Sequence, residues 1–197
     1  MIVELETPAG PARADLTLPA EKPKALLALT HGANGSMNAP DLHAVRDAAI
    51  EAGFAVALVS QAFAVAGRRT PPKPVLQDPA WVAAIQGLQR QRGLKGLPLY
   101  LGGRSNGARV ACRTAKELEA AGVVCLAFPV HPPGKPENSR LGELDNAGVP
   151  TLVVQGDRDP FGMPPGGNYG LVVIPGGDHG LKKDLPAIAR AVLAFLN

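Results

Sequence analysis

The chain has 197 residues, of which 46% are hydrophobic, so it is long enough for one domain with a substantial core and too apolar to be disordered. Its formal net charge is only +3 and no run of basic residues exceeds two, which argues against nucleic acid as a partner. No apolar run is long enough to span a bilayer, and the first ten residues lack the basic and apolar regions of a signal peptide, so we expect a cytoplasmic protein without a membrane partner.

The order of apolar and helical patterns along the chain predicts the fold class. The alternating segments 3–7 and 13–19 flank a turn rich in proline and glycine, which predicts a β-hairpin. Six short apolar runs typical of buried strands follow, at 25–30, 55–60, 98–101, 123–130, 151–155 and 170–174. Segments with helical spacing lie between or after them, at 40–52, 78–92, 106–121 and 183–196. We therefore expect a single α/β domain over residues 1–197, with a mostly parallel central sheet and helices on both faces.

Chemically active residues follow several of the predicted strands. In a sheet of this kind, ligands bind beyond the carboxyl ends of the strands. The segments expected at that edge are 31–32, 103–105, 131–132, 156–159 and 176–179. A serine, several carboxylates and several histidines should therefore meet at one edge of the sheet.

The segment Gly103-Arg104-Ser105-Asn106-Gly107 fits the Gly-x-Ser-x-Gly nucleophile elbow, with a predicted strand before it and a predicted helix after it. Glycine at both ends lets so tight a turn form without clashes of Cβ atoms. The serine would lie at a helix N-terminus, where the dipole and free N–H groups favour developing negative charge. With 23 glycines and four serines in the chain, roughly 0.05 matches are expected by chance, so we interpret Ser105 as a nucleophile.

A serine hydroxyl is a weak nucleophile until a base, usually histidine, removes its proton. Among the four histidines, His43 lies in a predicted helix, His31 precedes the serine, and His131 precedes two prolines. His179 follows the last predicted strand, so the chain can present nucleophile, acid and histidine in the order that α/β hydrolases use. We therefore predict His179 as the base, and we expect no metal ion and no cofactor.

Two aspartates between the nucleophile and the base follow the same predicted strand. We favour Asp159 as the acid, because the proline after it stops the strand and leaves its carboxylate in a loop. Asp157 is expected to be solvated or paired with Arg158. Asp178 is a poorer candidate, since adjacent residues on an extended chain point apart and it directly precedes the histidine.

Negative charge on a tetrahedral intermediate requires hydrogen-bond donors that are already in place. One predicted donor is the backbone N–H of Asn106, directly after the nucleophile. The other should come from the loop 31–35, where small residues let the backbone approach a substrate, and either Ala33 or Asn34 would supply it.

Three further residues are candidates for substrate contacts. Arg68 and Arg69 follow the predicted strand 55–60 and could reach the same edge, where they would pair with a carboxylate on the substrate. The alternative is that both are ordinary solvated loop charges. His131 is predicted as a wall residue of the site.

Taken together, the motifs resemble the small, lidless branch of the α/β-hydrolase superfamily, near dienelactone-hydrolase-like bacterial proteins. The resemblance spans nearly the whole chain and depends on the segments 31–35, 103–107, 128–136, 155–162 and 177–179. It implies an α/β-hydrolase fold without a cap domain and a catalytic triad on Ser105, Asp159 and His179. Dienelactone hydrolases proper use a cysteine nucleophile, so the serine of this chain argues against lactone specificity.

These features predict a serine hydrolase that cleaves a small ester or thioester through an acyl-enzyme. Only 20 residues separate Val130 from Thr151, which leaves no room for a cap domain, so we expect an open site for small or surface-exposed acyl groups. Peptidases share this machinery, and the sequence does not choose among esters, thioesters and peptides as substrates.

The alternative is a noncatalytic interaction protein, because relatives of the fold include scaffold subunits of chromatin complexes. A dinucleotide site is excluded, since no Gly-x-Gly-x-x-Gly follows the first parallel strand.

Overall fold

The computed structural model describes residues 1–197, which form eight strands and six helices. The strands are β1 (Ile2–Leu5), β2 (Ala12–Thr17), β3 (Leu26–Thr30), β4 (Ala55–Ser60), β5 (Leu99–Arg104), β6 (Gly122–Leu126), β7 (Thr151–Gly156) and β8 (Gly170–Ile174). The helices are α1 (Pro40–Glu51), α2 (Ala62–Val65), α3 (Pro74–Gln89), α4 (Asn106–Thr114), α5 (Leu141–Asp145) and α6 (Leu185–Leu196).

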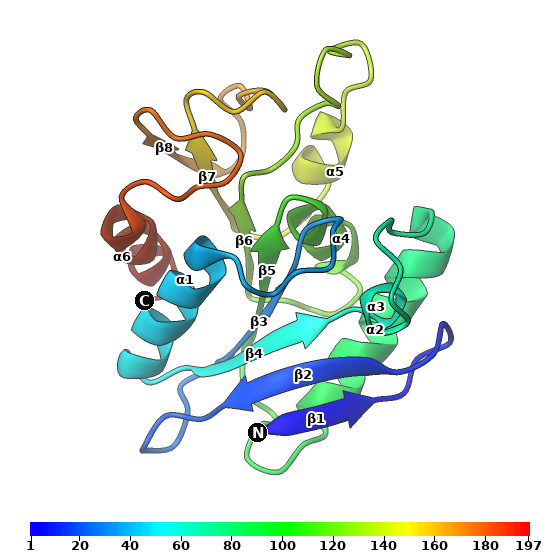
Figure 1. The fold of residues 1–197 in the computed structure, drawn as a ribbon. Coiled ribbons are helices and arrows are strands. Elements are labelled where there is room, and N and C mark those ends of the chain that lie inside the picture. Colours follow the sequence, from blue (N-terminus) through cyan, green and yellow to red (C-terminus); the bar gives the residue numbers. More distant parts are fainter.

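All eight strands belong to one sheet, in the order β1-β2-β4-β3-β5-β6-β7-β8. Strand β2 pairs antiparallel with both β1 and β4, and every pair from β4 to β8 is parallel. The predictions of an N-terminal hairpin and of a mostly parallel sheet are therefore confirmed. The carboxyl ends of β5, β6 and β7 point to the same edge, where the loops that follow them gather (Figure 1).

Helices cover both faces of the sheet, as predicted. Helices α1 and α6 contact each other on one face, and α3, α4 and α5 lie together on the other (Figure 1). In β3, Leu26 and Ala28 enter the core shared with α3 and α4, whereas Leu27 and Leu29 enter the core shared with α1 and α6. Because the central strands are buried on both faces, they are apolar at nearly every position, and this is why the sequence revealed them.

Several element boundaries differ from the prediction near the active edge. Strand β5 continues through the glycines to Arg104, which an apolar pattern cannot reveal because glycine has no side chain. Strand β6 ends at Leu126 rather than at residue 130, since Ala127 turns the chain with a φ of 50°. Helix α4 ends at Thr114 rather than at residue 121, and the chain then runs through turns into β6.

The remaining helices also refine the prediction. Helix α3 begins at Pro74, four residues before the predicted start, because proline at the first helical position needs no N–H partner. Helices α2 and α5 were not predicted, since four and five residues are too few to show helical periodicity. No helix in the structure combines the length and the apolar character that crossing a bilayer requires.

Candidate active site

Ser105 lies in the turn between β5 and α4, with a φ of 54° that only a few non-glycine residues adopt. Its backbone N–H donates to the carbonyl of Leu126 at 2.9 Å, which ties the turn to β6. A Cβ atom at Gly103 would lie 2.6 Å from the carbonyl oxygen of Thr30, and a Cβ atom at Gly107 would lie equally close to it, at 2.6 Å. Both glycines of the motif are therefore required because β3 and its carbonyls pack directly against the elbow.

The loop after β8 brings the ring of His179 between the side chains of Ser105 and Asp159. His179 Nε2 lies 2.9 Å from Ser105 Oγ, and His179 Nδ1 lies 2.8 Å from Asp159 Oδ2. The side chain of Asp159 is fully buried, whereas Ser105 and His179 are partly exposed. Since a carboxylate oxygen only accepts, Nδ1 carries a proton toward Asp159, and Nε2 of the neutral ring is left to accept from the serine hydroxyl.

The carboxylate of Asp159 is held from two further directions. Its Oδ2 accepts from Gln155 Nε2 at 2.9 Å, and its Oδ1 accepts from the backbone N–H of Phe161 at 2.8 Å. The Phe161 ring also stacks on the His179 ring, with centroids 4.0 Å apart and planes inclined by 27°. These contacts fix both the direction of the carboxylate and the plane of the imidazole.

Arg104, the residue before Ser105, connects the loops of the site. Its Nη2 donates to the backbone carbonyl of His179, and its Nε lies 3.2 Å from Oδ2 of the fully buried Asp41, in the first turn of α1. Its Nη1 also lies near Gly32, where a Cβ atom would be 3.7 Å away. Burial raises the pKa of the Asp41 carboxyl, and the nearby guanidinium opposes this by favouring the carboxylate. One guanidinium therefore links the serine turn, the histidine loop and α1.

The loop after β3 forms a turn beside the nucleophile. Gly35 N–H donates to the carbonyl of Gly32 at 3.1 Å, and Ala33 and Asn34 occupy the exposed tip. Neither the backbone N–H of Ala33 nor that of Asn34 makes a hydrogen bond within the protein. A Cβ atom at Gly32 would lie 3.5 Å from Ser105 Cβ, so the turn is close to the serine. Both predicted donors are thus unbonded near the nucleophile, and the first N–H of α4, that of Asn106, has no partner within its helix.

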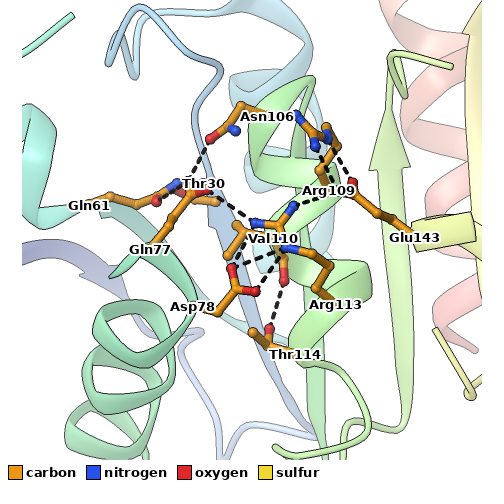
Figure 2. Close-up of polar contacts among 10 residues, drawn as sticks. All are labelled: Thr30, Gln61, Gln77, Asp78, Asn106, Arg109, Val110, Arg113, Thr114 and Glu143. Carbon is orange, nitrogen blue, oxygen red and sulfur yellow. Dashed lines mark hydrogen bonds and ion pairs between the residues drawn. The ribbon is translucent and has the colours of Figure 1, made fainter. Parts of the chain in front are cut away.

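Behind this turn, neutral side chains form a chain of hydrogen bonds (Figure 2). Asn106 Oδ1 accepts from Gln77 Nε2 at 2.6 Å, and the same nitrogen donates to Gln61 Oε1 at 2.8 Å. Gln61 Nε2 donates to Thr30 Oγ1 at 3.3 Å. All four residues are buried, so α3 holds the residue directly after Ser105 through a network of buried hydrogen bonds.

His31 belongs to the same network as a neutral imidazole. Its Nδ1 donates to the carbonyl of Gly32 at 2.8 Å, and its Nε2 accepts from the backbone N–H of Gln61 at 3.0 Å. Burial lowers the pKa of this fully buried ring, in agreement with a bonding pattern that needs an unprotonated Nε2. His31 therefore directly follows β3 and holds the start of the loop 31–35 through the carbonyl of Gly32.

Charged residues continue the network along α4 (Figure 2). Arg113 donates to Gln77 Oε1 at 3.1 Å and pairs with Asp78 at 2.7 Å. Arg109 forms two hydrogen bonds to Glu143 of α5, each of 2.7 Å. Helices α3, α4 and α5 are thereby joined around the helix that starts at the nucleophile.

The other predicted acids lie away from the imidazole. Asp157 is exposed and accepts from Gly176 N–H at 2.6 Å, and it forms no ion pair with Arg158. The predicted pairing with Arg158 is therefore absent, and the side chain is exposed. Asp178 is also exposed and accepts from Gly180 N–H at 2.8 Å.

None of the three predicted substrate contacts makes a hydrogen bond to Ser105, Asp159 or His179. His131 is half-buried and its Nδ1 donates to the carbonyl of Pro132 at 2.9 Å, without a hydrogen bond to the three central side chains. Arg68 and Arg69 do not directly follow a strand, because the short helix α2 intervenes after β4. Arg68 lines a separate cavity that does not include Ser105, and Arg69 is exposed.

Sequence reasoning assigned no role to five residues that hold the site: Asp41, Gln61, Gln77, Arg104 and Gln155. A weak signal exists for two of them. Gln155 is a polar residue near the end of an otherwise apolar strand, and Asp41 follows the proline that begins a helix. Buried polar residues in such positions need partners, which makes them candidate supports of a site.

Comparison with known proteins places the fold. The sequence pattern of the family described as "Alpha/beta hydrolase domain" matches residues 23–185. A serine hydrolase without lid from Xanthomonas campestris has 21% identity, covers 100% of this chain and 93% of its own, and has a TM-score of 0.77. Est1E from Butyrivibrio proteoclasticus, with ferulic acid bound, has 18% identity, coverage of 98% and 97%, and a TM-score of 0.79. A dienelactone hydrolase from Anabaena variabilis has 20% identity, coverage of 100% and 94%, and a TM-score of 0.75.

Each of these structures matches this chain over nearly the full length of both chains. At such low sequence identities the match shows the fold alone. The predicted absence of a cap domain is confirmed, because the chain matches the lidless hydrolase from end to end. The chain belongs to the α/β-hydrolase family and has its lidless fold.

Proposed function

We propose that the protein is a serine hydrolase that cleaves small esters or thioesters through an acyl-enzyme on Ser105. The observation that carries the proposal is the continuous pair of hydrogen bonds from Ser105 Oγ to His179 Nε2, at 2.9 Å, and from His179 Nδ1 to Asp159 Oδ2, at 2.8 Å. Membership of the α/β-hydrolase family supports it.

In the acylation step, Ser105 Oγ bonds to the carbonyl carbon of the substrate while His179 Nε2 takes the hydroxyl proton. Asp159 stabilises the imidazolium that forms. The carbonyl oxygen becomes an oxyanion, which accepts hydrogen bonds from the backbone N–H of Asn106 and from that of Ala33 or Asn34. His179 then passes its proton to the leaving alcohol or thiol, and the bond between that group and the acyl carbon breaks.

In the deacylation step, water attacks the acyl carbon and His179 Nε2 takes one of its protons. The bond from the acyl carbon to Ser105 Oγ breaks, and His179 returns the proton to the serine. One water is consumed for each ester, and a carboxylic acid leaves the site.

The surroundings of Ser105 favour small or surface-exposed acyl groups. Ser105 and His179 are partly exposed, the tip of the adjacent turn is exposed, and the fold has no cap to cover them. An acyl group attached to Ser105 would therefore gain little apolar burial from each added methylene. We expect kcat/KM to be higher for acetate than for decanoate esters of one alcohol, and a steep rise with chain length would contradict this.

A fluorophosphonate probe tests the function, because it bonds only to an activated serine. We expect labelling of the wild-type protein and none of Ser105→Ala. Ser139→Ala is the matched control, since Ser139 is an exposed serine in the loop before α5 and should leave labelling unchanged. Persistent labelling of Ser105→Ala would contradict the assignment of the nucleophile. A wild-type protein that is never labelled would contradict the proposal and indicate a noncatalytic protein that keeps the fold.

A further inference from the structure

A cavity of about 380 Å³ lies between the tip of the β1–β2 hairpin, α2 and α3. Its volume lies within the range of roughly 300–1,000 Å³ that small-molecule sites occupy. Ser105, Asp159 and His179 are not among the residues that line it, and the cavity meets the surroundings of the candidate active site through Gln61 and Gln77 of the network behind Asn106.

The cavity is apolar, with one charged side chain in its lining. Nine of its 14 lining residues are hydrophobic, among them the buried Phe63, Ala80 and Trp81. The lining amides of Gln61 and Gln77 already hydrogen-bond to each other and to the network beside Asn106. Arg68 is the one charged residue in the lining, so a ligand would meet an apolar body and a single cation.

The guanidinium of Arg68 is available to a ligand. Arg68 is exposed, forms no ion pair, and makes no side-chain hydrogen bond. No acidic residue occurs anywhere between Gln61 and Leu76. A guanidinium presents paired N–H donors that match the two oxygens of a carboxylate, so the local charge favours a carboxylate over a neutral group.

Trp81 forms part of the apolar wall of the cavity. It lines the cavity and is only 2% exposed, so a ligand bound there would lie against a tryptophan that is otherwise shielded from solvent.

We propose that this cavity binds a small carboxylic acid with an apolar body. The apolar body lies against Trp81 and Ala80, and the carboxylate pairs with Arg68 at the opening. The ligand has either of two sources with this shared chemistry, namely a free carboxylic acid or the acidic end of an ester substrate. The site does not depend on the proposed hydrolase function, because binding requires neither Ser105 nor His179.

Intrinsic fluorescence tests the binding directly, because Trp81 is the only tryptophan of the chain. We expect 3-phenylpropionate to change the fluorescence of the wild-type protein in a saturable manner, and to do so equally for Ser105→Ala. The alcohol 3-phenylpropanol has the same apolar body without the charge and should bind more weakly. Absence of any saturable change with 3-phenylpropionate would overturn the proposal, whatever the protein hydrolyses.

Variants at the opening test the role of the cation. Arg68→Gln should weaken the binding of 3-phenylpropionate by about three- to tenfold and leave that of 3-phenylpropanol unchanged, since the pair is solvent-exposed and worth less than a buried one. Arg69→Gln is the matched control, because it removes the same charge from a residue that does not line the cavity. Equal affinity of wild type and Arg68→Gln for the carboxylate would overturn the assignment.

Variants inside the cavity test the location. Ala80→Leu places three more carbon atoms in the cavity and should abolish the fluorescence response. Ala66→Leu narrows the exposed opening and serves the same purpose if Ala80→Leu fails to fold, as judged by circular dichroism. Unchanged binding in a folded variant of either kind would show that the acid binds elsewhere.

Steady-state kinetics with wild-type enzyme then distinguish the two sources. If the carboxylate belongs to the substrate, 3-phenylpropionate competes with an ester that has a distal carboxylate, and Arg68→Gln raises KM for that ester but not for its neutral analogue. If the ligand is a free acid, 3-phenylpropionate still binds in the fluorescence titration. In the kinetic assay, however, it leaves KM unchanged for both esters. Either pattern supports the cavity as the binding site.

Discussion

The two sides of the candidate active site are held by different kinds of interaction. On the side of β7 and β8, charged groups hold His179, with the carboxylate of Asp159 at its ring and the guanidinium of Arg104 at its carbonyl. On the side of β3 and β4, neutral groups hold the loop 31–35 and Asn106, through the imidazole of His31 and the amide of Gln77 respectively. In the proposed reaction, the first side carries the group that gains and loses a proton, and the second carries backbone donors that only need a fixed position.

This difference follows from what each side must do in the proposed reaction. An imidazole that becomes an imidazolium is stabilised by an adjacent negative charge, so a carboxylate is required beside it. Backbone N–H donors stabilise an oxyanion because they are already oriented, and neutral hydrogen bonds suffice to hold them. The comparison predicts that changes on the charged side affect catalysis most, and that changes on the neutral side have smaller effects.

The largest effect is expected for Asp159→Asn. An amide in this position cannot stabilise the imidazolium and favours the wrong tautomer of His179, so kcat should fall by about 10⁴-fold. Asp157→Asn is the matched control, because Asp157 is an exposed aspartate of the same loop that does not contact the imidazole. Ester hydrolysis under saturating substrate measures both. A loss of less than tenfold in Asp159→Asn would show that the charged side is not essential.

Arg104→Gln should lower kcat by about 10- to 100-fold, because the loop of His179 loses its tie to the serine turn and small displacements of reacting groups are costly. KM should change little, since Arg104 does not bind the substrate. The variant also leaves the buried Asp41 without its cation, so the double variant Arg104→Gln, Asp41→Asn should be more stable than Arg104→Gln alone.

Arg46→Gln is the matched control for Arg104→Gln, because it removes a partly buried arginine of α1 whose partner is Asp47. It should leave kcat unchanged. Equal kcat values in Arg104→Gln and Arg46→Gln would refute the role of Arg104 in holding the loop of His179. Urea unfolding confirms that both variants are folded at the assay temperature.

Gln77→Leu tests the neutral side and should lower kcat by about tenfold, with KM nearly unchanged. The substitution removes the donor to Asn106 and Gln61, so two buried acceptors lose their partner and the N–H of Asn106 is no longer held in place. Gln86→Leu changes an exposed glutamine of the same helix and should have no effect on kcat. If the two variants were equally active, the network would serve stability alone.

The smallest effect is a pH dependence of stability from His31. Burial lowers the pKa of this ring from its ordinary value of 6.5, so below that pH the unfolded chain binds a proton that the folded protein does not. Stability is therefore fully present above pH 6.5 and falls as the pH drops through the window between 6.5 and the lower folded-state pKa, by at most about 1.4 kcal/mol per pH unit.

His31→Gln cannot gain this proton, so its free energy of unfolding should lose that part of the acid dependence. His43→Gln replaces a half-buried histidine of α1 and should retain the acid dependence of the wild type. Urea unfolding at a series of pH values below 6.5 measures both variants against the wild type. Parallel curves for the wild type and His31→Gln would contradict a neutral, buried imidazole behind the loop 31–35.

Local patterns were sufficient to predict the strands and the three central residues. The strands at 55–60 and 170–174 were predicted at their observed boundaries, because each is a short apolar run. Ser105, Asp159 and His179 do lie together, since each follows a strand whose carboxyl end is at the same edge. Their catalytic roles stay predictions until the experiments above are done.

The supports of the site could not be predicted, because they depend on how distant elements pack. Arg104 meets Asp41 only when α1 packs over the end of β5, and Gln77 meets Asn106 only because α3 crosses beside α4. No spacing along the chain records either contact. Nor could spacing predict that Arg68 lines a cavity with α3, since the short helix α2 comes between β4 and Arg68.

The central claim is that Ser105 becomes acylated, and intact-protein mass spectrometry after an acid quench measures this directly. During turnover of p-nitrophenyl acetate, we predict that the wild-type protein gains the mass of one acetyl group, located by peptide mapping on Ser105, and that Asp159→Asn accumulates it far more slowly. The account would be contradicted by an acetyl group on any other residue, or by equal acetylation of Ser105→Ala.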